Sequence, residues 1–195
     1  FTINVFCFFS RNGTPWCFTT FLNEQFVAII EKKIIYSIFS MSKNYINIYN
    51  NLINYSRNKD LYISLNRQDN FSDRLTFFLI HFAFFLKNYK NEENKEILQK
   101  IYDFNFRQLE LSIREIGYGD QSINKKMKVY LNLFHAIVSE IHFWDDLDKN
   151  EKLKKLSIFL EDFSKIENLV VYFDDFNQNL SKKSLNFFLK GVSNL

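Results

Sequence analysis

The stretch LTFFLIHFAFFL, residues 75–86, is the most apolar part of the 195-residue chain. Its apolar side chains occupy almost every side of a helix, a pattern typical of a helix that other elements surround. The run is too short to cross a membrane, which takes roughly 18 consecutive apolar residues. We therefore predict a central core helix from Asp73 to about Lys90, with Ser72 as its N-cap and His81 as a hydrogen-bonded core residue.

Helical periodicity also marks the segments on both sides of this core helix. Apolar residues recur at a spacing of three or four over the ranges 45–57, 95–116, 127–141, 151–165, 167–177 and 182–190. Glycine and proline are scarce, with 4 and 1 residues, and no segment shows the sustained alternation of strands. The sequence therefore predicts an all-α fold, a compact bundle of six or seven helices, the last of them ended by Gly191.

Residues 1–40 differ in composition from the remainder of the chain. They contain both cysteines and the only proline, and few charged residues. The chain opens on Phe1, and Met41 is its first methionine. The segment has neither the basic start of a secretory signal nor the arginine content of a transit peptide. We expect residues 1–40 to be upstream read-through or a disordered lead, and residues 41–195 to form one helical domain.

The turn between the third and fourth predicted helices carries the clearest local signals. Gly117 follows the last apolar position of its helix, where a left-handed residue commonly ends a helix. Asp120 is expected either to cap the next helix, a role that Ser122 could also take, or to accept a hydrogen bond from Arg114.

Glu115 lies at the same helix C-terminus, where the helix dipole disfavours an anion. We therefore expect a cation to hold the Glu115 carboxylate, and Lys125 or Lys126 is the nearest candidate in the sequence.

Little in the sequence points to catalysis, a cofactor or a metal. The formal net charge is +3, too small to indicate a nucleic-acid-binding protein, and we expect no DNA partner. Two readings of His142 with Asp145 and Asp146 are a divalent-cation site and an acidic turn that caps a helix, and we favour the turn. We therefore expect no catalytic residue, no metal ligand and no cofactor.

The densest basic group is formed by Lys125, Lys126 and Lys128. Such a cluster is either an ordinary solvated helix face or a surface that contacts phosphate groups, for instance those of ribosomal RNA or lipid headgroups.

Three segments together resemble the ubiquinol-cytochrome c chaperone family. Residues 113–120, IREIGYGD, followed by the lysine group, are similar to the family pattern L-R-E-x-G-x-G-D with its basic pair. Residues 48–62 resemble the family's opening L-Y-x-x-L motif, and residues 73–86 resemble its R-F-x-x-x-x-L-H helix. Leu75, Phe82 and Asn124 depart from the residues that are usual in the family.

The resemblance implies a non-enzymatic assembly chaperone for ubiquinol-cytochrome c reductase (complex III) that binds newly made cytochrome b. Some members act with a small partner protein and near the ribosome. The expected location is peripheral to the inner membrane, in the bacterial cytoplasm or on the matrix side of mitochondria. The alternative is a small helical enzyme or regulator that shares the scaffold.

The resemblance and the local signals together assign two groups of residues. The partner-binding group is Lys125, Lys126 and Lys128, and the structural group is Arg74, His81, Arg114, Glu115, Gly117, Gly119 and Asp120. A chaperone for a membrane-embedded subunit needs exposed apolar area. We therefore also expect an exposed patch of Phe and Tyr, located on the closing helices.

Overall fold

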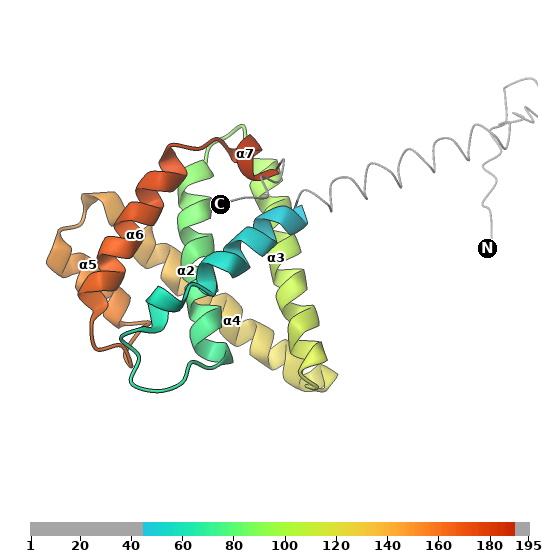
Figure 1. The fold of residues 1–195 in the computed structure, drawn as a ribbon. Coiled ribbons are helices and arrows are strands. Elements are labelled where there is room, and N and C mark those ends of the chain that lie inside the picture. The colour runs from blue at the N-terminus through green and yellow to red at the C-terminus, as the bar shows by residue number, and fades with distance from the viewer. Residues whose placement is uncertain (1–44, 190–195) are drawn as a thin grey trace, which may run out of the picture. The chain divides into compact units, whose positions relative to one another are not determined.

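The computed structural model describes residues 45–189, which form an all-α fold (Figure 1). The first described helix covers residues 45–56. It is followed by η1 (Lys59–Tyr62), α2 (Phe71–Tyr89), α3 (Lys95–Glu115), α4 (Asp120–Ile141), η2 (Trp144–Asp146), α5 (Lys149–Ser157), α6 (Ile166–Ser181) and α7 (Leu185–Leu189). Within this range only one isolated β-bridge interrupts the helical architecture. The all-α prediction is confirmed, whereas the predictions for residues 1–40 and for Gly191 lie outside the described residues.

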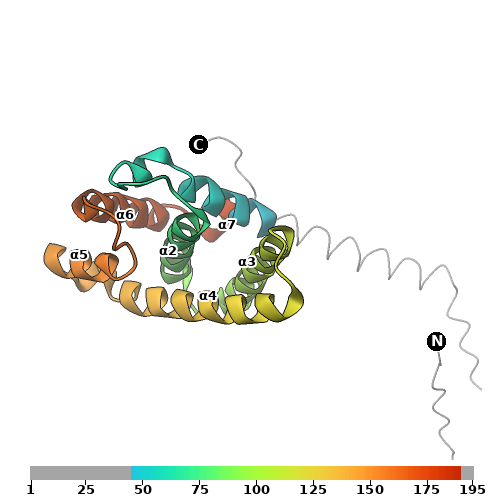
Figure 2. The same cartoon turned by 90° about the horizontal axis from the view of Figure 1, so that it is seen from below.

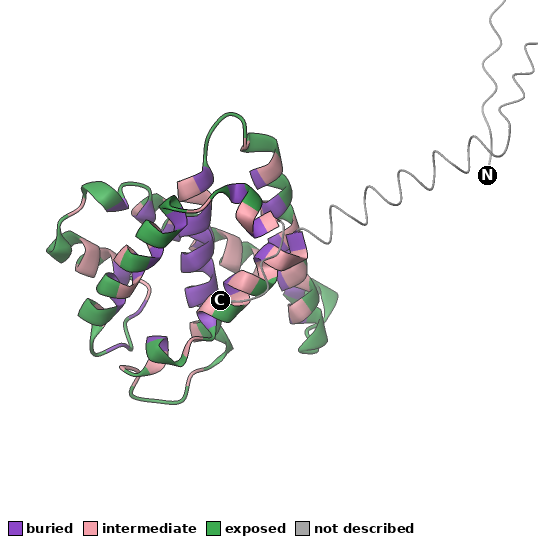
Figure 3. Cartoon of the chain, turned by 45° about the horizontal axis from the view of Figure 1, so that its top comes forward, coloured by how far each residue is buried: buried purple, intermediate pink, exposed green. Residues whose placement is uncertain are grey.

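Helix α2 is the centre of the fold, as its sequence predicts. Every residue from Leu75 to Phe85 is buried, including His81. Figures 1 and 2 show the other helices arranged around α2, and Figure 3 shows buried positions along its length. Because apolar side chains lie on all its sides, α2 can bury surface against several neighbours at once.

Aromatic pairs join α2 to several of its neighbours. Phe82 stacks on Phe134 of α4 with ring centroids 5.2 Å apart, and Phe84 stacks on Phe173 of α6 at 5.5 Å. Phe78 meets Tyr49 of the first described helix edge to face at 5.7 Å. Aromatic pairs of this kind add about 0.5–1.5 kcal/mol each beyond their buried area. Of the 16 phenylalanines within residues 45–189, 11 are buried in this core.

The N-cap of α2 is a different residue from the predicted one. Asn70, rather than Ser72, is the N-cap: its side chain accepts from the Asp73 amide at 3.0 Å, and the Asp73 carboxylate accepts from the Asn70 amide at 2.9 Å. This reciprocal capping box satisfies two backbone donors at once, which a serine two residues later could not do with the same partner. Asp73 does lie in the first turn, as expected.

The closing helices have other boundaries than their periodicity predicts. Helix α5 ends at Ser157 instead of continuing to Lys165, because the chain turns there to bury Leu160 and Phe163. The Ser164 amide donates to the Ser64 carbonyl at 3.0 Å, so this turn is fastened to the connection that precedes α2. Helix α6 is longer than predicted and α7 is shorter.

Helix α4 lies along one side of the molecule, as seen from below in Figure 2. It packs mainly on α2 and also on α3. Its buried positions are Ile123, Phe134, Ile137 and Ile141, all on one face. None of the helices among residues 45–189 combines the length and the apolarity needed to cross a membrane.

Candidate functional site

The turn between α3 and α4 has the glycine geometry that the sequence predicts. Gly117 has a φ of 100°, in the left-handed region that favours glycine, and its amide donates to the Arg114 carbonyl at 2.9 Å. The N-cap of α4 is Gly119, with no side-chain cap, so the expectation that Asp120 or Ser122 caps this helix is wrong. The Gly119 carbonyl instead accepts from the Ser122 and Ile123 amides, which leaves Asp120 as the first helical residue.

The substitution Gly117→Val is expected to lower the free energy of unfolding by more than about 1 kcal/mol, because a β-branched residue is strained at positive φ. The matched control is Gly119→Val. Gly119 has a φ of −71° and open space where a Cβ would lie, so its loss should be clearly smaller. Urea denaturation of both variants measures the difference. Equal losses at the two positions would contradict the role of the positive φ.

Arg114 links the two helices through the turn. Its guanidinium donates to Glu110 on α3 at 2.9 Å and to Asp120 on α4. The predicted contact between Arg114 and Asp120 is therefore present. Glu115 has no ion-pair partner within residues 45–189, so the expectation that Lys125 or Lys126 holds its carboxylate is wrong. Glu115 is exposed, and water can solvate its charge instead.

The lysine group occupies the first turns of α4 beside this linkage. Lys125 and Lys128 are exposed, and the Lys126 ammonium lies 4.2 Å from the centre of the Tyr118 ring, a cation–π contact. Tyr118, Lys125, Lys126 and Val129 help to line a shallow pocket of about 400 Å³. Lys125 and Lys126 therefore present charge beside exposed apolar side chains, whereas Lys128 does not line this pocket and lies on the other side of Lys125 around the helix.

His81 is fully buried and makes two hydrogen bonds. Its Nδ1 lies 2.6 Å from the Phe77 carbonyl, which can only accept, so Nδ1 carries the proton. Its Nε2, 2.9 Å from the Tyr172 hydroxyl, then accepts from that hydroxyl. Burial lowers the pKa of His81 to about 4, which keeps the ring neutral. The predicted hydrogen-bonded core histidine is present in the described fold.

Arg74 lies at the start of α2, away from the lysine group. Its Nε donates to Asp69 in the preceding connection, and its side chain lines a small pocket together with Arg57 and Phe71. The structural residues of the sequence prediction are thus distributed over three places: the α2 start, the buried centre of α2, and the α3–α4 turn.

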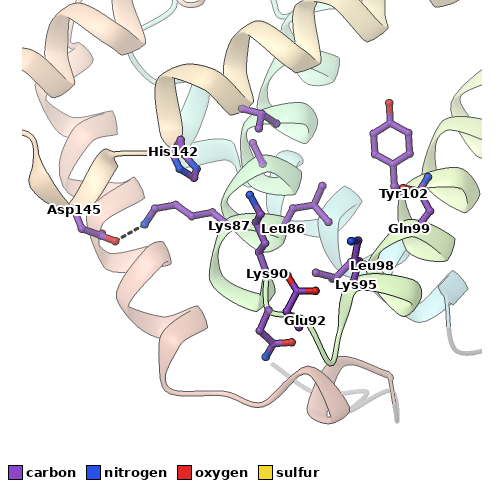
Figure 4. Close-up of a pocket in the computed structure, with 13 residues that line it drawn as sticks. Leu86, Lys87, Lys90, Glu92, Lys95, Leu98, Gln99, Tyr102, His142 and Asp145 are labelled. Atoms are coloured by element: carbon purple, nitrogen blue, oxygen red, sulfur yellow. Dashed lines mark hydrogen bonds and ion pairs between the residues drawn. The ribbon is translucent and has the colours of Figure 1, made fainter.

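A larger cleft lies between α2, α3 and α4 (Figure 4). It has a volume of about 890 Å³ and includes the apolar side chains of Ala83, Leu86, Leu98 and Val138. Lys87 lines the cleft and donates to Asp145. The other polar residues at the rim include Lys90, Glu92, Lys95 and His142. No local sequence signal marks this cleft, because most of its residues come from three helices that are separate in the sequence.

The expected aromatic patch on the closing helices is absent from the described residues. The exposed aromatic side chains there are Phe71, Tyr118 and Phe143, and none of them lies in α5, α6 or α7. The aromatic residues of α6 and α7 face the core instead: Phe173, Phe176 and Phe188 are buried. The apolar composition therefore reflects the core more than a surface patch.

The acidic turn after α4 is part of the packing between helices. Asp145 accepts from Lys87 and from the Asn177 amide group, and Asp146 lies in η2. Among residues 45–189, no three His, Cys, Asp or Glu side chains are grouped so that they could hold a metal ion.

Comparison with known proteins identifies the relatives of this fold. The crystal structure of the Cbp3 homolog from Brucella abortus is similar with a TM-score of 0.67 and 21% sequence identity, over 83% of this chain and 93% of that chain. At this identity the similarity shows the fold alone. No curated protein matches the chain.

The model of the ubiquinol-cytochrome C chaperone family matches residues 64–191, about two thirds of the chain. The matched range includes Arg74, His81 and the whole α3–α4 turn with its lysine group, and it begins after the family-like segment at residues 48–62. A chaperone family with this fold suggests a non-enzymatic role. The chain therefore belongs to the ubiquinol-cytochrome C chaperone family.

Proposed function

We propose that the chain is an assembly chaperone for ubiquinol-cytochrome c reductase and that newly made cytochrome b is its client. Membership of the ubiquinol-cytochrome C chaperone family is the observation that carries this proposal. The proposed location is the periphery of the inner membrane, on the cytoplasmic side in bacteria or the matrix side in mitochondria. A small partner protein and the ribosome are further partners that the family resemblance implies.

The cleft between α2, α3 and α4 is the site that we propose for the client. A nascent membrane subunit exposes apolar side chains, and the cleft offers apolar contacts with Ala83, Leu86 and Val138. Its volume of about 890 Å³ is at the upper end of what small-molecule pockets reach, and it suits several side chains of a polypeptide segment. The charged side chains at its rim are hydrated and border the apolar surface of the cleft.

A tryptophan placed in the cleft tests this proposal. Gln99 lines the cleft, is exposed, and bonds only to Asp103 on its own helix, so Gln99→Trp should fill the cleft without affecting the fold. We expect about tenfold less cytochrome b to copurify with this variant, which corresponds to a loss of about 1.4 kcal/mol of binding. The matched control is Gln178→Trp at an exposed position of α6, which should capture cytochrome b as the unmodified chain does.

Two outcomes of this experiment would count against the proposal in different ways. If the unmodified chain captures no cytochrome b, the client is wrong. If it captures cytochrome b equally well with and without Gln99→Trp, the client is right and the cleft is not its site.

The lysine group is proposed as a second contact surface, one that faces a partner rather than the core. The residues of the family-like pattern whose contacts or backbone geometry support the fold, Arg74, His81, Arg114, Gly117, Gly119 and Asp120, are proposed to maintain it. The two groups should therefore respond differently to substitution.

The double substitution Lys125→Glu with Lys126→Glu is expected to leave folding intact and to lower the amount of assembled reductase severalfold. Neither lysine forms an ion pair with a carboxylate of residues 45–189, so charge reversal breaks no such contact there. Thermal melting of the purified variant and native gels of membranes from cells carrying it measure the two properties. Unchanged assembly would exclude a partner-binding role for these lysines.

A further inference from the structure

The outward face of α4 carries no acidic residue over most of its length. Between Asp120 and Glu140 the helix contains lysine as its only charged residue type. The exposed residues at helical spacing along this face are Lys125, Lys128, Val129, Asn132, Ala136 and Ser139. At 1.5 Å per residue, the acid-free segment is about 27 Å long. Figure 2 shows that α4 lies along one side of the described fold, where no other helix of residues 45–189 covers this long face.

Exposed apolar side chains adjoin the cationic end of this face. Ile116 and Tyr118 in the preceding turn are 53% and 42% exposed, and Val129 is 56% exposed. Tyr118 and Val129 line the same shallow pocket as Lys125 and Lys126. Cations and apolar groups are therefore interleaved at one place, the α3–α4 turn together with the first turns of α4.

The three lysines of this surface form no ion pair, a condition that they share with most lysines of residues 45–189. Lys100, Lys152 and Lys155 each bond a carboxylate on their own or a neighbouring helix. Within residues 45–189, Lys125, Lys126 and Lys128 have no such partner. Lys125 and Lys128 are also three positions apart on the helix, where like charges repel each other. An anionic partner would relieve this repulsion.

The apolar component decides which anionic partner fits best. The phosphate backbone of a nucleic acid would attract the lysines but would leave Ile116 and Val129 in water. A bilayer surface offers anionic headgroups next to apolar acyl chains, and tyrosine is enriched at that boundary. A long open helix face also suits a planar partner more than a narrow one.

We propose that the α3–α4 turn and the outward face of α4 dock on an anionic lipid bilayer. Lys125, Lys126 and Lys128 contact the lipid phosphates, while the side chains of Ile116, Tyr118 and Val129 enter the headgroup region. This inference rests on the proposed function, because it names the partner of the lysine surface assigned there. It leaves the client cleft between α2, α3 and α4 free to hold a segment that emerges at the membrane.

The test measures co-sedimentation of the full chain with lipid vesicles. One set consists of phosphatidylcholine alone, and the other of phosphatidylcholine with an equal amount of phosphatidylglycerol. Each lysine near an anionic surface strengthens binding by about fivefold, so Lys125→Glu with Lys126→Glu should weaken binding to the anionic vesicles at least about 25-fold. Binding should also fall with added salt.

Two further variants separate the charge and apolar parts of the surface. Lys59→Glu with Lys182→Glu makes the same change of net charge at exposed positions outside α4 and should bind like the unmodified chain. Ile116→Ser with Val129→Ser keeps the lysines and should still weaken vesicle binding, because it removes the apolar contacts. A surface that bound only the phosphates of RNA would not respond to this pair of substitutions.

Three results would overturn the proposal: no preference for the anionic vesicles, equal losses for the two charge-reversal pairs, or lysine-dependent binding to polyuridylate RNA without vesicle binding. The last result would assign the surface to nucleic acid. Copurification of cytochrome b is measured separately with the same variants. If the chain binds vesicles normally but captures no cytochrome b, the proposed client is wrong and the lipid-binding surface stands.

Discussion

Phe84→Ala is expected to lower the free energy of unfolding by about 3–5 kcal/mol, the cost of removing a large aromatic ring from a packed core. The Phe84 ring is fully buried in α2, with ring centroids 5.2 Å from Trp144 and 5.5 Å from Phe173. These two partners come from η2 and α6, so the cavity would loosen contacts between three elements. Domains are stable by about 5–15 kcal/mol in total, and the variant should therefore be close to unfolding.

Urea denaturation followed by circular dichroism measures this loss, with Phe143→Ala as the control. Phe143 is 61% exposed, so its truncation should change the free energy of unfolding by less than about 0.5 kcal/mol. If Phe84→Ala cost less than about 1 kcal/mol, α2 would not be the centre of the core. If the variant does not fold at all, the milder Phe84→Leu should show an intermediate loss.

The central position of α2 could be predicted because it depends on one segment alone. A run that is apolar on all sides has no solvent-facing side and must be surrounded. Gly117 could be predicted for the same reason, since its left-handed conformation follows from the local chain. The end of α5 could not, because the turn that follows it buries Leu160 and Phe163 and is fastened to Ser64, which is far away in the sequence.

The candidate sites show the same division between local and tertiary information. The contact of Arg114 with Asp120 spans one short turn and was among the expected alternatives. The partner expected for Glu115 depended on how α3 and α4 diverge, and sequence spacing does not give that angle. The cleft depends on three helices together, and no periodic pattern marks Leu86 or Val138 as its lining.

His81 makes a second prediction with a large effect, because its ring is buried in the neutral form. Both ring nitrogens are occupied: Nδ1–H donates to the Phe77 carbonyl, and Nε2 accepts from the Tyr172 hydroxyl. The ring also stacks on Tyr55 and contacts Phe173 and Phe176, so water cannot solvate a positive charge there. Burial accordingly lowers the pKa of His81 to about 4, against an ordinary value of 6.5.

Acid should therefore destabilise the fold through this one side chain. Between pH 6.5 and 4 the unfolded chain binds a proton at His81 that the folded chain does not, so the free energy of unfolding falls as the pH falls. A difference of about 2.5 pKa units corresponds to about 3 kcal/mol, fully present above pH 6.5 and lost by about pH 4.

The control must separate His81 from the carboxylates, which also respond to acid. The pKa of Asp69, for example, is lowered by its hydrogen bond from Arg74, and that contribution is lost in the same direction as the pH falls. His81→Gln keeps a polar side chain but cannot take up the proton, so its stability should fall by about 3 kcal/mol less than that of the unmodified chain over this range. Urea denaturation of both proteins at several pH values gives the two curves. Parallel curves would show that His81 is not a buried neutral histidine in the folded chain, and the expected convergence toward acid pH would show that it is.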